Sequence, residues 1–229
     1  MSEYEPKLTP ERVEHLRRWH ETTSARLHAL GAYDTTYLGL YLHVPELVFG
    51  PTPTSDLLGT LVTERTRPGS RALDMGSGAG ANGILAARAG AEVVAVDVNP
   101  HAVAATAMNA ERNGVADRVV ALESNLFDEV DGRFDLIVFD PPFRWFAAND
   151  LLDRAVTDEN YRSLGRFFAD VPARLRADGE ILLFFGASGD VEHLDSLIRV
   201  AGLSSELLDE RTIDVRGEPT TYFVRSLTR

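Results

Sequence analysis

Asp74-Met75-Gly76-Ser77-Gly78-Ala79-Gly80 stands between a short predicted strand, 71–74, and a predicted helix, 80–88. The alternating glycines let the backbone approach a ligand closely, and the amino-terminal end of the helix offers free N–H groups. A tight turn alone would not require three such glycines. This junction of strand, glycine loop and helix is typical of nucleotide-type cofactor sites in parallel α/β sheets, so it indicates both a fold and a binding site.

The segments that follow this loop alternate between predicted strands and helices. Further strands are expected at 92–97, 118–123, 134–139 and 180–185, and helices at 56–65, 100–113, 158–176 and 190–201. The chain closes with two strands, 207–215 and 220–226, as a hairpin around residues 216–219, so its last strand must run antiparallel to its partner. We therefore predict an α/β fold with a Rossmann-like, doubly wound sheet of seven strands, mostly parallel with an antiparallel C-terminal strand.

The first 46 residues lack this alternation of strands and helices and are expected to form an N-terminal helical extension or lid. Thr9 is a predicted N-cap, Pro10 follows at the first helical position, and apolar residues recur at helical spacing until Gly31. An aromatic stretch and an extended run come next. We expect the main domain to span residues 47–229, and the turn-rich segment Gly50–Ser55 leads into its first helix.

The composition fits a soluble globular chain: of 229 residues, 44% are hydrophobic and 25% charged. The absence of cysteine excludes disulfides, a thiolate nucleophile and cysteine-ligated zinc. A net charge of −12 disfavours general binding to nucleic acid. No apolar run approaches the roughly 20 residues of a membrane span, and the acidic residues 1–6 are unlike a signal peptide. We expect a cytoplasmic protein with no membrane or metal partner, as a monomer or weak homodimer.

The glycine loop by itself fits two kinds of cofactor. Its first two glycines match the relaxed dinucleotide fingerprint, and Asp97 follows about 20 residues later, where it could accept both ribose hydroxyls. Asp74, however, lies just before the first glycine, where it would repel a pyrophosphate. A carboxylate there suits a cationic amino group, such as that of S-adenosylmethionine. This cofactor is therefore favoured, and a nicotinamide-dependent reductase is the other enzymatic interpretation.

Asp140-Pro141-Pro142-Phe143 follows the apolar strand 134–139 and faces the same crevice, because ligands of such sheets gather beyond the carboxyl ends of the strands. The prolines stiffen the backbone and leave carbonyls as acceptors without a competing N–H. Asp140 adds a side-chain acceptor and Phe143 a flat apolar face. The group suits a planar NH₂ aimed at an electrophilic methyl carbon, with catalysis by positioning and electrostatics.

Together these motifs resemble class I S-adenosylmethionine-dependent methyltransferases. The likeness rests on 73–80, Val96-Asp97, 124–128 and 134–143, and it covers about residues 47–226. The nearest likeness is to the small-domain branch that includes release-factor glutamine methyltransferases and amino-directed RNA methyltransferases. It implies that residues 47–229 form a class I methyltransferase domain whose closing strand is antiparallel.

The resemblance also implies a role for each residue of the motifs. The methionine part of S-adenosylmethionine would be held by Asp74, Gly76, Gly78 and Gly80. Asp97 would bind the ribose hydroxyls, with Val98 beside it, and Asn125 and Leu126 would lie beside the adenine. Asp140, which also borders the cofactor, and the Pro141 carbonyl would hold the acceptor NH₂, and Phe143 would stack on it. These last three form the predicted catalytic set: Asp140, Pro141 and Phe143.

The sequence does not determine which molecule accepts the methyl group. Asp140 replaces the asparagine typical of the glutamine enzymes, an exchange more like the nucleobase amino methyltransferases, which favours an RNA base. The acidic charge instead favours a nitrogen, amide or amine, of a small molecule or a protein side chain. An alternative of another class is a cofactor-binding module without transfer activity.

Overall fold

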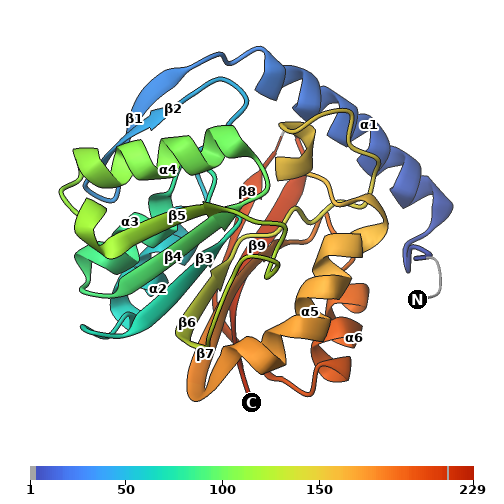
Figure 1. The fold of residues 1–229 in the computed structure, drawn as a ribbon. Coiled ribbons are helices and arrows are strands. Elements are labelled where there is room, and N and C mark those ends of the chain that lie inside the picture. Colours follow the sequence, from blue (N-terminus) through green and yellow to red (C-terminus); the bar gives the residue numbers. More distant parts are fainter. Residues whose placement is uncertain (1–3, 216) are drawn as a thin grey trace.

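The computed structural model describes residues 4–215 and 217–229, and within them the predicted sheet is present (Figure 1). Seven strands lie in the order β5-β4-β3-β6-β7-β9-β8. Only β9 is antiparallel to its neighbours, β7 and β8, so the predicted fold class is confirmed. Arg216, in the predicted turn, lies outside the described residues. The strands are β3 (Arg71–Met75), β4 (Glu92–Asp97), β5 (Val119–Glu123), β6 (Phe134–Phe139), β7 (Leu175–Gly186), β8 (Ser204–Asp214) and β9 (Pro219–Thr228).

Helices cover both faces of this sheet, so its inner strands are apolar on both sides (Figure 1). The helices are α2 (Asp56–Arg65), α3 (Ala81–Arg88), α4 (Pro100–Arg112), α5 (Arg162–Arg174) and α6 (Val191–Val200). Along β7, Ile181 and Leu183 belong to the core on the side of α5 and α6, whereas Leu182 belongs to the core under α2 and α3. Because successive side chains of a strand point to opposite faces, one apolar run supplies both cores.

The helix predicted over 158–176 is wrong at both ends. Asn160 and Tyr161 have φ values of 56° and 51°, which no α-helix accommodates, so α5 begins only at Arg162. At the other end the chain enters β7 at Leu175, which pairs with Phe134. Glu180 pairs with Leu136, so residues 176–179 loop out of the ladder. Asp178-Gly179, which follows the predicted helix, therefore belongs to an irregularity within a strand.

The N-terminal region contains a helix and a hairpin. α1 (Pro10–His28) begins as predicted, with the Thr9 hydroxyl accepting a hydrogen bond from the N–H of Arg12. β1 (Tyr33–Tyr37) and β2 (Leu40–Val44) form a separate antiparallel sheet, which the sequence analysis did not predict. The hairpin lies beside α4, and residues 45–55, here called the connector, link it to α2 (Figure 1). The boundary at residue 46 and the lid role stay predictions.

α1 is fixed against the loop that follows β6. His20 stacks on Phe146 with ring centroids 5.4 Å apart. At the end of the helix, Nε2 of His28 lies 2.6 Å from Oδ2 of Asp150. The helix therefore lies over the segment that continues from the Asp-Pro-Pro-Phe motif. No helix among the described residues has both the length and the apolar character to cross a bilayer.

Candidate functional site

The glycine loop lies at the carboxyl ends of β3 and β4, as predicted. Gly76, Gly78 and Gly80 have φ values of 71°, 53° and 85°, a region that side chains disfavour. The N–H of Gly76 donates to the carbonyl of Val96 at 2.8 Å, which joins the loop to β4. A Cβ atom at Gly78 would lie 2.8 Å from the Phe49 carbonyl oxygen. Glycine is therefore needed here for backbone shape and for the close approach of the connector.

Asp97 holds the loop from the tip of β4. Its Oδ2 accepts the N–H of Gly78 at 2.9 Å, and its Oδ1 accepts the N–H of Asn99 at 2.9 Å. Burial raises the pKa of Asp97, although these two hydrogen bonds oppose the rise. Each carboxylate oxygen keeps a second lone pair that could accept a ribose hydroxyl. The adjoining Val98 is exposed at the edge of the site.

Asp74 and Asp140 come from neighbouring strands. Asp74 pairs with Val138 in the ladder between β3 and β6, so Asp140 emerges at the same edge. Asp74 is buried, and its Oδ2 accepts the N–H of Gly83 at 2.8 Å. Burial raises the pKa of Asp74 to about 7. Burial, and then the charge of Asp74, raise the pKa of Asp140 to about 7 as well. Two such carboxyls favour a cationic ligand, whose charge would stabilise both as carboxylates.

The Asp-Pro-Pro-Phe segment is held in place by Tyr161. The Tyr161 hydroxyl donates to the carbonyl of Phe143 at 2.7 Å and accepts the N–H of Asp190 at 2.8 Å. Pro141 is buried, whereas Phe143 is half-buried, with its ring centroid 5.6 Å from that of Phe185. The backbone of the motif is therefore rigid, and the Phe143 ring packs beside the carboxyl end of β7 while part of it stays exposed.

Asn125 and Leu126 lie in the turn after β5, next to the tip of β4. The N–H of Ser124 donates to the carbonyl of Asp97 at 3.0 Å. The Ser124 hydroxyl donates to the carbonyl of Leu126 at 2.8 Å, and Leu126 takes the unusual φ of 57°. The side chain of Asn125 is exposed. The structure thus brings every predicted site residue to one edge of the sheet.

Sequence reasoning missed two polar residues of α4 that shape this loop. The Thr106 hydroxyl donates to the carbonyl of Gly78 at 3.2 Å. Asn109 is fully buried, accepts the N–H of His43 at 2.9 Å, and donates to the carbonyls of His43 and Ala79, both at 2.9 Å. It therefore ties β2 to the glycine loop. The available signal was a polar pair, three positions apart, within an otherwise alanine-rich helical face.

Tyr37 belongs to the aromatic stretch noted in the sequence, and in the structure it lies in the unpredicted hairpin. Its hydroxyl donates to the carbonyl of Ser55 at 2.6 Å. Burial raises the pKa of Tyr37, and the next largest cause is the charge of Asp140. The hairpin and the end of the connector therefore lie close to Asp140. No local pattern indicates this contact, because it depends on how the hairpin packs.

Several methyltransferases are similar to this chain. The family model of the methyltransferase small domain matches residues 52–198. Ribosomal RNA small subunit methyltransferase C of Chromohalobacter salexigens is 37% identical over 154 residues, which are 65% of this chain and 43% of that protein. Release factor glutamine methyltransferase of Cereibacter sphaeroides is 30% identical over 189 residues, which are 75% of this chain and 65% of that protein.

A solved structure is similar as well. It is a 16S rRNA methyltransferase from T. thermophilus in complex with AdoMet and guanosine, with a TM-score of 0.63 and 27% identity over 86% of this chain and 50% of that one. These matches confirm the resemblance indicated by the motifs. The chain spans less than two thirds of the length of each of these three proteins.

Proposed function

The chain belongs to the methyltransferase small domain family, and we propose that it moves a methyl group from S-adenosylmethionine to a nitrogen of a small molecule or a protein side chain. The observation that carries this proposal is the pair Asp74 and Asp140, two carboxyls with pKa values raised to about 7 beside a glycine loop. A cofactor with an ammonium and a sulfonium group would stabilise both carboxylates. Residues 47–229 would be the transferase domain, and 1–46 an extension or lid.

The residues at the ends of β3, β4 and β5 fit this cofactor. The open space beside Gly76, where an added Cβ would touch nothing within 4 Å, leaves the backbone accessible to the methionine part. Asp97 would bind the ribose hydroxyls through its remaining lone pairs. When bound, S-adenosylmethionine supplies an electrophilic methyl carbon. The full proposed cofactor set is Asp74, Gly76, Gly78, Gly80, Asp97, Val98, Asn125, Leu126 and Asp140.

Asp140, Pro141 and Phe143 would orient the acceptor. Asp140 and the Pro141 carbonyl accept hydrogen bonds from the NH₂ group, which aims its lone pair at the methyl carbon. Phe143 stacks on the planar group around that nitrogen. The proton becomes acidic only as the new bond forms, so no strong base is needed beforehand. As a carboxylate hydrogen-bonded to that nitrogen, Asp140 would be placed to take up the proton.

The second candidate acceptor is the amino group of an RNA base. It is favoured by the similarity to the ribosomal RNA enzyme of C. salexigens and to the structure solved with AdoMet and guanosine. A net charge of −12 opposes contact with a phosphate backbone. A binding module without transfer activity is the alternative of another class.

Labelled methyl transfer tests these choices. Purified protein, S-[methyl-³H]adenosylmethionine and cell extract separated into RNA, protein and metabolite fractions should give label in the protein or metabolite fraction. Label in RNA would instead establish the second candidate. Cofactor binding without label in any fraction would support the binding module. Failure to bind S-adenosylmethionine, together with an absorbance change on adding a reduced nicotinamide, would support the reductase.

Asp140→Ala is the variant that tests the catalytic assignment. Asp140 would bind the acceptor and only border the cofactor, so cofactor affinity should stay within about tenfold, roughly 1.4 kcal/mol. Turnover should fall by orders of magnitude because the nitrogen is no longer oriented. Calorimetry and the label assay measure the two effects separately. Full turnover in this variant would refute the role given to Asp140.

A further inference from the structure

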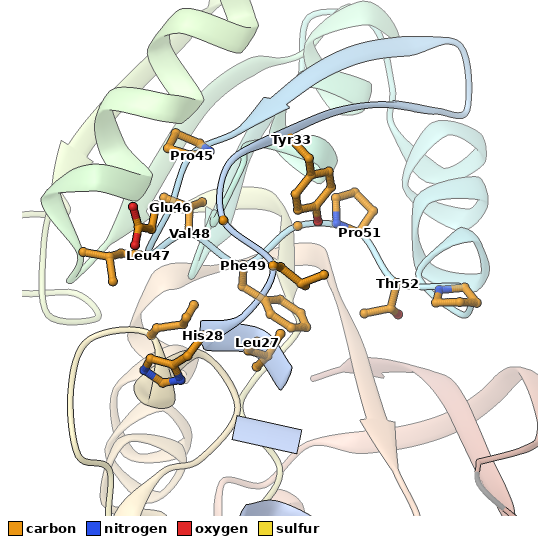
Figure 2. Close-up of a pocket in the computed structure, with 15 residues that line it drawn as sticks. Leu27, His28, Tyr33, Pro45, Glu46, Leu47, Val48, Phe49, Pro51 and Thr52 are labelled. Carbon is orange, nitrogen blue, oxygen red and sulfur yellow. The ribbon is translucent and has the colours of Figure 1, made fainter. Parts of the chain in front are cut away.

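A pocket of about 240 Å³ lies beside the glycine loop and contains none of the predicted site residues. It is bounded by the end of α1, the start of β1, the connector and Leu152 in the loop after β6. Figure 2 shows Leu27, Tyr33 and Phe49 gathered around this space, from α1, β1 and the connector. An apolar cavity of about 150 Å³ is large enough to hold benzene, so this one has room for a single ring with a short substituent.

The chemistry of the lining selects the kind of molecule that could enter. Most of its side chains are leucine, valine, proline or aromatic. Glu46 contributes a carboxylate, and the described residues of the lining include no lysine or arginine. His28 also lines the pocket, and its Nε2 lies 2.6 Å from the Asp150 carboxylate. Among the described lining residues, an anion would therefore meet only the His28 side chain, which is already paired with Asp150, so the pocket favours an uncharged or cationic molecule.

The connector joins this pocket to the proposed cofactor site. Leu47, which lines the pocket, has a φ of 69°, and its carbonyl accepts a 2.7 Å hydrogen bond from the Asn99 side chain. The backbone N–H of the same Asn99 donates to Asp97 at 2.9 Å. A leucine in this region is strained by about 1–3 kcal/mol, and such strain persists where surrounding contacts impose it, often at functional sites.

The other end of the connector leads toward Asp140. Thr52 lines the pocket, and its N–H donates to the Ser55 hydroxyl at 2.9 Å. The Ser55 carbonyl accepts the Tyr37 hydroxyl at 2.6 Å, and Tyr37 lies near enough to Asp140 for that charge to raise its pKa. The connector therefore contacts the proposed cofactor site at Asn99 and approaches the proposed acceptor site at Ser55.

We propose that this pocket binds the apolar body of the methyl acceptor, and that the acceptor is a small molecule, uncharged or cationic, with one ring and an amine or amide nitrogen. The inference rests on the proposed function and narrows its substrate class. A glutamine side chain has no ring to fill the space, and a nucleotide carries phosphates for which the described lining supplies no lysine or arginine. The apolar walls bind the body, and Glu46 favours positive charge at the rim.

Three ring compounds of equal size and different charge test this proposal: benzylamine, benzamide and benzoate. The full chain is saturated with S-adenosylhomocysteine and titrated with each probe, and affinity is measured by chemical-shift changes. Benzylamine and benzamide should bind at least tenfold more tightly than benzoate. Equal affinity for all three, or no binding by any, would overturn the proposal.

Two variants with matched controls locate the binding site. Glu46→Lys should shift the preference at least tenfold toward benzoate, whereas Glu111→Lys, the same charge change at an exposed position of α4, should not. Leu30→Trp should lower the affinity for benzylamine at least tenfold, because the larger side chain fills the pocket from its rim. Its control is Leu207→Trp on β8, since these two leucines are 59% and 52% exposed and neither substitution disturbs the core. Identical behaviour of variant and control would contradict the assignment.

The outcomes separate this inference from the proposed function. If S-adenosylhomocysteine does not bind and no methyl is transferred, the proposed function fails, and with it the acceptor role of the pocket, even where the probes bind. If methyl is transferred to the metabolite fraction and benzylamine inhibits that transfer, the inference is supported. Label confined to RNA or protein would refute it while leaving methyl transfer intact.

Discussion

Asp140→Asn should stabilise the cofactor-free protein, and the gain should grow as the pH rises. Burial and the neighbouring Asp74 raise the pKa of Asp140 from 3.8 to about 7. Between these two values the folded state binds more protons than the unfolded state, so the stability contributed by this group falls as the pH increases. An asparagine has nearly the same volume and no charge, so it removes this effect without opening a cavity.

The raised pKa sets the size of the effect. A rise from 3.8 to about 7 corresponds to about 4 kcal/mol at 1.36 kcal/mol per unit. Most of it develops above about pH 5, because the unfolded carboxyl is largely ionised there while the folded one is not. Asp140 is not fully enclosed, and part of the shift belongs to its pairing with Asp74, so the expected gain in the free energy of unfolding is smaller. We expect about 2 kcal/mol more stabilisation near pH 8 than near pH 5.

Urea denaturation of wild type and Asp140→Asn at these two pH values measures the difference directly. Asp131→Asn, at an exposed position before β6, is the matched control for loss of a carboxylate. A difference in unfolding free energy that stays constant with pH, or that shrinks toward pH 8, would show that Asp140 is not held in a charge-disfavouring environment. The main argument for a cationic ligand would then be lost.

Three further outcomes follow from the same geometry. Asp97→Ala should weaken S-adenosylmethionine binding at least tenfold in calorimetry, because it removes the ribose acceptor and frees the N–H of Gly78; unchanged affinity would contradict the pocket assignment. Asn109→Ala should lower the free energy of unfolding by about 3 kcal/mol, since it leaves polar groups of His43 and Ala79 without partners. A loss below about 1 kcal/mol in urea denaturation would argue against the tie between β2 and the glycine loop. S-adenosylmethionine should bind more tightly as the pH rises from about 6 to 8, because its positive charge lowers the pKa values of Asp74 and Asp140 from about 7. Binding should therefore release protons. Calorimetry in buffers of different ionisation enthalpy measures this release, and finding none would contradict the prediction.

Local sequence patterns were enough to predict most of the helices and strands of the main domain. The strands predicted at 92–97 and 134–139 have those bounds in the structure, because a buried parallel strand is a short apolar run between turn residues. The helix predicted to run to residue 176 instead ends at Arg174, because the chain pairs with β6 from Leu175 onward. That choice depends on a partner strand about forty residues away, which no local window contains.

Residue types and spacing alone determined that this chain carries a glycine loop after one strand, an Asp-Pro-Pro-Phe segment after another, and the family likeness that both imply. Only the tertiary structure decided that Asp74 and Asp140 emerge side by side, because the order of strands in the sheet brings β3 next to β6. Their raised pKa values have the same origin, since loss of water around a carboxyl depends on every segment packed over it. The pocket between α1, the connector and Leu152 is likewise built from segments far apart in the chain, which meet only when their apolar surfaces are buried together.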